Sequence, residues 1–255
     1  MKRFQWMTSP LLLALLTPTL TRADLAQGLD AAAREDWATA YREFKESALR
    51  GNANAAVNLG NLYMRGLGVP QDYAQARAWY EKAALESNPI GEAKLGVLYY
   101  VGLGVDENRT RAAEWFQKAG DQGDAHSAMT LGEMYLAGDG VPQSRTEAYV
   151  WYTIASELGY REAEQPRIKL AAELPGAEIS AALERVDIWR KSYALQVEKA
   201  SRLTAKKTKP ADAGVPTPDA AHPESTPSSA MPKAEKKTTR KKKSEGLKRE
   251  DRPKG

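Results

Sequence analysis

Leu59-Gly60-Asn61-Leu62-Tyr63-Met64-Arg65-Gly66-Leu67-Gly68-Val69 recurs twice along the chain, in related form, at an unvarying interval. The second copy begins at Leu95 and the third at Leu131, and each is displaced by 36 residues from the one before (95 − 59 = 36 and 131 − 95 = 36). A fixed period of this size is typical of a solenoid of stacked helix pairs. Such stacks usually bind partners and seldom carry out chemistry, so the repeat bears on function as well as on fold.

Composition excludes several classes of site. The 255 residues include no cysteine and two histidines, His126 and His222. Disulfides, thiolate metal sites and cysteine nucleophiles are therefore excluded, and a metal site with several imidazoles cannot be assembled in one chain. We predict no metal and no cofactor. The net charge of +4 is uneven, because Ser201–Gly255 holds 15 Lys/Arg and 7 Asp/Glu (+8), which leaves −4 for the remainder.

The first 23 residues have the pattern of a secretory signal. Lys2 and Arg3 precede an apolar run from Pro10 to Leu16, and Thr21-Arg22-Ala23 offers small residues where a signal peptidase cleaves. A membrane anchor is disfavoured, because the run is too short for about 30 Å of hydrocarbon. We expect cleavage near Ala23, a mature protein without a transmembrane span, and a periplasmic or secreted location.

Between leader and tail, each unit is expected to form helix, turn and helix. The predicted domain, 24–203, comprises a partial unit at 24–51, units at about 52–87, 88–123 and 124–159, and a C-terminal cap at 160–203. Asp72, Asn108 and Ser144 share one position before the second helix, and such side chains accept hydrogen bonds from the free amides of a helix's first turn. Alanines and aromatic residues at helical spacing in that second helix indicate core.

The C-terminal part divides at 204. In the cap, an apolar stripe is predicted to face the third unit, made of Ile179, Leu183, Val186 and Trp189. From 204 to 255 there is no Phe, Trp or Tyr, half of the 14 prolines occur, and lysines come in runs. Low hydrophobicity with high charge predicts a disordered basic tail.

The repeat resembles a known family. The pattern A-x-x-x-L-G-x-x-Y-x-x-G-x-G-V followed by A-x-x-W-Y/F-x-x-A, which begins at Ala55 and resumes at Ala76, is similar to that of the Sel-1-like repeats, relatives of the tetratricopeptide repeats. The resemblance covers roughly residues 36 to 160. It implies an all-α fold, an α/α superhelical solenoid of helix-turn-helix units with a C-terminal capping helix and a disordered tail. It also implies an adaptor of the bacterial envelope that is not an enzyme. Some cysteine-rich members act on cell-wall-like ligands, but their disulfide-linked repeats are missing here.

No catalytic constellation is visible in the sequence. There is no G-x-S-x-G and no phosphate-binding loop, and the Gly-x-Gly-Val turns recur identically in every unit, which indicates turn geometry. His126, the single histidine of the folded part, is interpreted as a solvated loop residue. A hydrolase is our third hypothesis, and it requires His126 to meet a serine and a carboxylate.

Recognition is expected at positions that vary while their neighbours repeat. In tetratricopeptide-like stacks the first helix of each unit lines the concave side, so these positions form rows along a groove. The predicted partner-binding residues are Asn58, Asn61, Met64, Lys94, Val97, Tyr100, Thr130, Glu133 and Leu136. The row Met64, Tyr100 and Leu136 is apolar and either holds a protein segment or packs on the adjacent unit. The sequence leaves both readings open.

The tail supports an alternative function of another class. Its basic cluster is predicted to contact an anionic polymer or lipid head groups through Lys236, Lys237, Arg240, Lys241, Lys242 and Lys243. No aromatic residues interleave with these cations, so stacking on bases has no platform and we expect no nucleic acid partner. The leading hypothesis remains a non-catalytic, exported protein-interaction scaffold with a partner protein in the cell envelope.

Overall fold

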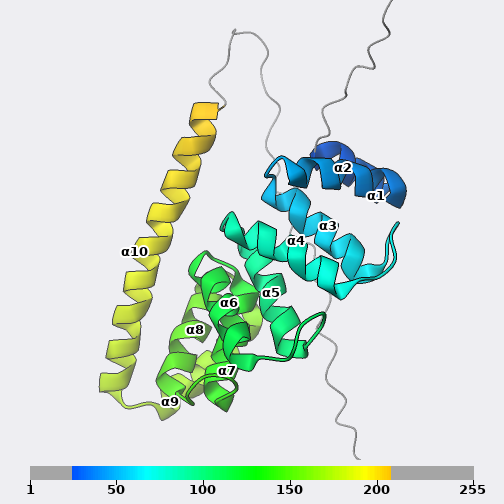
Figure 1. Ribbon diagram of the computed structural model, residues 1–255. Helices are drawn as coiled ribbons and strands as arrows, with labels where there is room; N and C mark the ends of the chain where they lie inside the picture. The colour runs from blue at the N-terminus through cyan, green and yellow to red at the C-terminus, as the bar shows by residue number, and fades with distance from the viewer. Residues whose placement is uncertain (1–24, 208–255) are drawn as a thin grey trace, which may run out of the picture. The chain divides into compact units, whose positions relative to one another are not determined.

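The computed structural model describes residues 25–207, which form consecutive helix pairs (Figure 1). Within this range there are ten α-helices, one short 3-10 helix and no strand. The helices are α1 (Leu25–Ala33), α2 (Trp37–Leu49), α3 (Ala53–Arg65), α4 (Tyr73–Leu85), α5 (Pro89–Val101), α6 (Arg109–Asp121), α7 (Ala125–Ala137), α8 (Arg145–Glu157), η1 (Arg161–Ala163), α9 (Glu164–Glu173) and α10 (Gly176–Lys207). Each helix from α1 to α8 packs chiefly on its neighbours along the chain, which confirms the predicted all-α solenoid.

Capping explains where the helices begin and end. The side chains of Asp72, Asn108 and Ser144 accept hydrogen bonds from backbone amides at the start of α4, α6 and α8, as predicted. The first helix of each of these units ends at a glycine in the left-handed conformation, such as Gly66 with φ 70°. Its amide donates to the carbonyl of Leu62, so a helix end is satisfied at a position where a side chain would be strained.

A second set of glycines lets the paired helices approach closely. A Cβ atom added at Gly60 would lie 2.5 Å from the ring of Tyr80, and one at Gly96 would lie 2.7 Å from Phe116. Both rings are buried, with 1% and 0% of their residues' surface exposed. Glycine is therefore needed at the position of Gly60 and Gly96, because only a residue without a Cβ atom there lets the aromatic ring of the second helix pack this close to the first helix.

The turn glycines join one unit to the next. Gly104, with φ 67°, lies against the backbone of Tyr73, the first residue of α4 in the preceding unit. An added Cβ would come within 2.5 Å of the Tyr73 carbonyl group. Gly140 contacts Arg109 of α6 in the same way. The Gly-x-Gly-Val motif is thus an inter-unit contact as well as a helix-turn device.

The N-terminal unit, predicted to be partial, forms a helix pair with a shorter first helix and a shorter connection than the full repeats. Gly28 of α1 faces the ring of Phe44 of α2, the same relationship as in the full repeats. The connection is only residues 34–36, against 66–72 in the next unit. The long glycine turn serves to contact a preceding unit, and the described residues contain none before α1.

The C-terminal helices pack on α8. Ala182 and Val186 of α10 are fully buried and Trp189 is 8% exposed, so these residues cover the third repeat. Leu183, predicted to share this face, is 40% exposed, because the buried positions follow the spacing 182, 186 and 189. The helix also continues to Lys207, four residues beyond the predicted boundary at 203.

Three predictions fall outside the described residues. They are the signal peptide at 1–23, the disorder of the tail beyond Lys207, and the basic cluster between Lys236 and Lys243. Among helices in the described range, none is long and apolar enough to cross a bilayer.

Candidate interaction surface

The nine predicted partner-binding residues lie on α3, α5 and α7, at three equivalent positions. Asn58 and Lys94 are half-buried at the first of these positions. Thr130, their counterpart, is only 7% exposed, so its side chain is not available to a partner. The prediction is wrong at Thr130, because repeat equivalence does not guarantee equal exposure.

At the second position, the varying residue changes together with the buried aromatic residue on the second helix of the same unit. The Tyr80 hydroxyl on α4 donates a 2.8 Å hydrogen bond to Oδ1 of Asn61 on α3. In the next unit the same two positions hold Val97 and Phe116, which has no hydroxyl to satisfy. In the third they hold Glu133 and Tyr152, and burial together with the Glu133 carboxylate raises the pKa of Tyr152 to about 12. Variation at this position therefore follows the aromatic residue beneath it.

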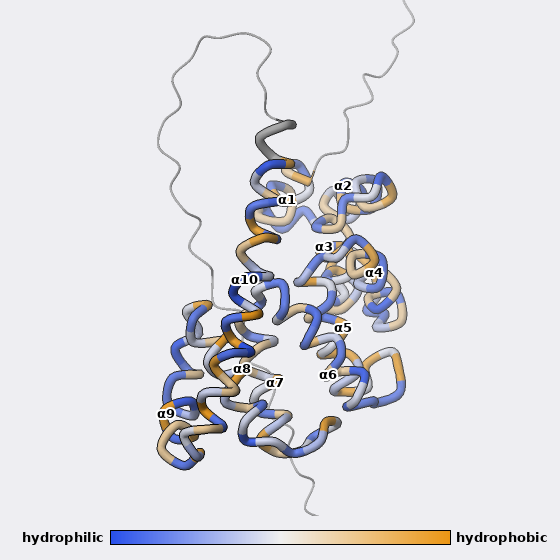
Figure 2. Tube along the Cα trace, turned by 90° about the vertical axis from the view of Figure 1, so that its left-hand side faces the viewer, coloured by the Kyte–Doolittle hydropathy of each residue, from blue (hydrophilic) through white to orange (hydrophobic). Residues whose placement is uncertain are grey.

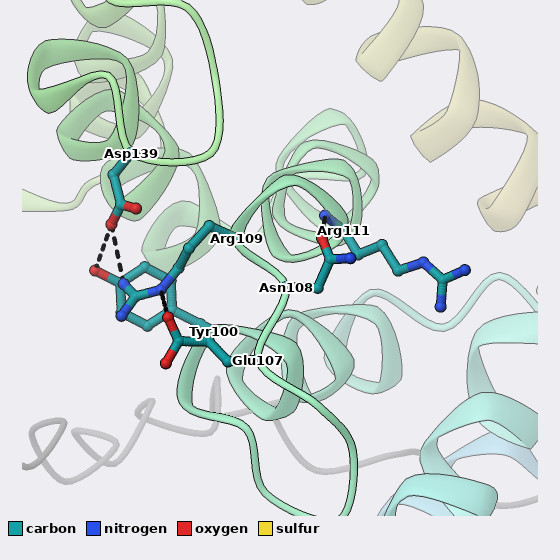
Figure 3. Close-up of polar contacts among 6 residues, drawn as sticks. All are labelled: Tyr100, Glu107, Asn108, Arg109, Arg111 and Asp139. Atoms are coloured by element: carbon teal, nitrogen blue, oxygen red, sulfur yellow. Dashed lines mark hydrogen bonds and ion pairs between the residues drawn. The ribbon is translucent and has the colours of Figure 1, made fainter.

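At the third position, Tyr100 is engaged in joining two units (Figure 3). Its hydroxyl donates to Oδ2 of Asp139 at 3.1 Å, in the turn of the following unit. The Arg109 guanidinium lies 3.8 Å from the centre of the Tyr100 ring and pairs with Asp139 at 2.9 Å. Glu107 holds the same guanidinium from the other side at 2.8 Å. Tyr100 thus packs on the adjacent unit, one of the two readings that the sequence left open.

The preceding junction uses apolar residues in the same places. The positions of Tyr100, Arg109 and Asp139 are occupied there by Met64, Tyr73 and Leu103. Met64 and Leu103 pack against the apolar core. Leu136, the third member of the predicted row, is half-buried like Tyr100. This row lies at the inter-unit junctions and leaves limited surface for a partner.

The accessible apolar surface lies on α5. Ile90 is 47% exposed and Val101 48%, with Val97 half-buried and Lys94 between them. Their spacing of four, three and four residues places them on one face of the helix. We did not predict Ile90 and Val101, although their repeat positions also vary (Asn54 and His126, Arg65 and Ala137) and so carried the same signal.

Polar residues occupy the place equivalent to that of Ile90 on the first helices of the adjacent units, Asn54 on α3 and His126 on α7. On α3, the side chain of Asn54 accepts a 2.7 Å hydrogen bond from Nδ2 of Asn88, at the start of α5. The backbone carbonyl of Asn54 accepts from Nδ2 of Asn58 at 3.0 Å. His126, predicted to lie in the loop before α7, is instead within this helix. It is exposed, and its ring centre lies 5.8 Å from that of Tyr160 in an edge-to-face arrangement. An apolar centre with a polar rim is the anatomy of a protein-binding patch.

The surroundings of His126 bear on the hydrolase hypothesis. The neighbouring Ser127 is fully buried, and its hydroxyl has no hydrogen-bond partner in the structure. His126 is exposed, so the two side chains do not share one surface. Among residues 25–207 there is also no cluster of His, Asp and Glu arranged to hold a metal ion.

Comparison with known families identifies the repeat. The Sel1 repeat model matches residues 53–88, 89–124 and 125–160, which begin at the first residues of α3, α5 and α7. The chain carries three Sel1 repeats. Sel1 repeat proteins are generally protein–protein interaction scaffolds, and their fold is typically non-catalytic.

Solved structures agree with this identification. A Sel1 repeat protein from Oxalobacter formigenes is 29% identical over 55% of this chain and 55% of its own, with a TM-score of 0.52. The protein c5321, a protective antigen of uropathogenic Escherichia coli strains with the same repeat fold, is 27% identical over 71% of this chain, with a TM-score of 0.56. The match covers 38% of c5321, so this chain spans about half or less of either relative. No curated protein matches the sequence.

Proposed function

We propose that this protein is a non-catalytic scaffold that holds a segment of a partner protein on the exposed faces of α3, α5 and α7. The observation that carries the proposal is the apolar face of α5, with Ile90 and Val101 about half exposed. Fully burying an aliphatic side chain of this size contributes roughly 1.5–3 kcal/mol, so burying the exposed half of Ile90 and of Val101 contributes roughly half of that for each residue.

The chemistry of the surface also restricts the partner segment. Lys94 lies between Ile90 and Val97 on the same face and makes no ion pair within residues 25–207. A segment with two or three apolar side chains and a nearby carboxylate would complement it. Asn58 and His126 at the rim offer hydrogen bonds at the edges of the contact.

The test is capture of an envelope protein by the full chain, compared between two variants. Ile90→Glu/Val101→Glu places charge on the proposed surface and is expected to abolish capture. Leu85→Glu is the matched control, because Leu85 is 84% exposed on α4, outside this surface. Both variants should unfold at nearly the same temperature as the original chain. Equal capture by both variants would contradict the proposal.

We also propose that the protein is exported, which rests on the charged start and apolar run of residues 1–23. N-terminal sequencing of the chain recovered from the envelope fraction tests this, with a mature terminus at Asp24 expected. An intact Met1 in a cytoplasmic fraction would contradict it.

A second candidate function is contact with an anionic polymer through the basic tail. It is supported by the charge of +8 over Ser201–Gly255. Removal of residues 208–255, which spares α10, should abolish polymer binding that weakens as salt is raised. Binding that persists without the tail would exclude this function.

A further inference from the structure

Helix α10 borders a groove that the repeats alone do not explain. A cavity of about 400 Å³ lies between α10, α8 and α6. Its walls include Gln117 and Asp121 from α6, Trp151 from α8, and Ile188 and Ser192 from α10. The groove lies beside the second helices of the repeats, and it is distinct from the α3–α5–α7 surface proposed above.

The same side of α10 carries an exposed apolar stripe. Ile188, Leu195 and Leu203 are 67%, 56% and 62% exposed. With Ser192 and Lys199 between them, they follow a spacing of four, three, four and four residues, which is one helix face. Because Ile188 and Ser192 also line the groove, the stripe continues along the groove side of α10. Figures 1 and 2 show α10 continuing past α8, with hydrophobic segments recurring along it.

Charge differs between the groove and the far end of the stripe. Asp121 lines the groove, and burial raises the pKa of its carboxyl group. Glu114 lies seven residues earlier on the same face of α6 and is exposed. The stripe, by contrast, contains Lys199, while Arg202 beside Leu203 is already paired with Glu198 at 2.5 Å. Arg185, the cation that also lines the groove, is paired with Glu147. Lys199 is therefore the charge on the stripe that complements Asp121.

We propose that the α10 groove binds the distal half of α10 from a second copy of this chain, which forms a two-fold dimer. In an antiparallel pairing centred between Leu195 and Gln196, Ile188 lies opposite Leu203 of the second copy, and Ser192 opposite its Lys199. The second copy's Lys199 then approaches Asp121. A two-fold interface makes every such contact twice, so three exposed aliphatic residues become six buried ones.

The dimensions suit a specific dimer. The stretch from Ile188 to Leu203 is about 24 Å long at 1.5 Å per residue. A specific interface needs about 1,000 Å² of total buried surface, and here each copy contributes both a helix face and a groove.

The first test is sedimentation equilibrium of the full chain over a range of about 1 to 100 µM, where a dimer of micromolar Kd is expected. Leu195→Glu/Leu203→Glu should raise the Kd at least about tenfold with unchanged thermal unfolding, since both residues are exposed. Leu183→Glu is the matched control, because Leu183 is an exposed leucine on another face of α10. It should leave the Kd unchanged.

A charge exchange makes the register falsifiable. Asp121→Lys and Lys199→Glu should each weaken the dimer, and the double variant should recover most of the loss, because the two charges are exchanged as a pair. A monomer at every concentration overturns the proposal. So does a dimer that Leu183→Glu disrupts as strongly as the stripe variant, or one that the charge exchange fails to restore. None of these variants touches Ile90 or Val101, so the outcome is independent of the proposed scaffold function.

Discussion

The hydroxyl of Tyr80 on α4 donates its hydrogen bond to Asn61 on α3, a residue that varies among the repeats. Tyr80 is 1% exposed, so its hydroxyl needs a partner within the protein. In the next repeat Phe116 needs none, and Val97 takes the place of Asn61. The difference between these repeats is therefore a matched pair of core residues.

This pairing predicts a compensating exchange. Tyr80→Phe should destabilise the protein by about 1 kcal/mol through loss of the hydrogen bond, and Asn61→Val by about 1–3 kcal/mol, because it leaves a buried hydroxyl without a partner. The double variant converts this pair to that of the next repeat and should return close to the original stability. Urea unfolding measures all three. Simple addition of the two single losses would contradict the pairing.

The junction of the second and third repeats predicts a graded response to charge removal. Asp139→Ala removes the partner of both Tyr100 and Arg109 and should cost about 1–2 kcal/mol, because both side chains are partly buried at the contact. Glu107→Ala removes an ion pair in which the Glu107 side chain is 54% exposed, and should cost less than about 0.5 kcal/mol. Thermal or urea unfolding distinguishes them. Equal losses would show that Tyr100 adds nothing to the junction.

Glycine replacement predicts opposite signs at two positions. Gly96→Ala places a methyl group 2.7 Å from the Phe116 ring and should cost about 1–3 kcal/mol by overpacking. Gly176→Ala meets no atom within 4 Å at the start of α10, and should be neutral or stabilising by up to about 1 kcal/mol. Calorimetry of the two variants tests this. A neutral Gly96→Ala would mean that the ring shifts freely.

The pKa of Tyr152 predicts a loss of stability in alkali. Burial, and after it the Glu133 carboxylate, raise this pKa from 10.0 to about 12, whereas the unfolded chain ionises near pH 10. The folded protein keeps the proton while the unfolded chain releases it. The stabilisation is complete below pH 10 and is lost as pH rises to about 12, which amounts to about 2–3 kcal/mol.

The measurement is urea unfolding at several values between about pH 9 and 12. Tyr152→Phe cannot ionise and should lose less stability than the original chain over this range. Glu133→Gln should show an intermediate loss, because it removes only the second cause. Parallel curves for the original chain and Tyr152→Phe would contradict the expectation.

Much of the fold could be predicted because its signals are local. The N-cap residues Asp72, Asn108 and Ser144 bond to amides three residues away, and the glycine after each first helix sets its own backbone conformation. The period of 36 residues then fixes the order of the helices. Leu183 was misplaced because several positions on a long helix are apolar, and only its packing on α8 selects the buried ones.

The candidate surface was predicted in part. Variation among repeats correctly drew attention to the first helices, yet it did not separate positions that face solvent from positions matched to a buried neighbour. Thr130 is buried, Asn61 accepts a hydrogen bond from Tyr80, and Tyr100 donates one to Asp139. Ile90 and Val101, by contrast, are exposed. These distinctions depend on contacts between residues 19 to 39 positions apart.

The sequence by itself determined the repeat, its helix boundaries and its turns, because these depend on hydrogen bonds and glycine conformations within a few residues. Only the tertiary structure decided which varying residues are core, why the first unit has a short turn, and where α10 leaves an apolar stripe exposed. Those properties depend on which helices meet and how closely. A side chain's role is then set by its neighbour across the contact, which local sequence does not specify.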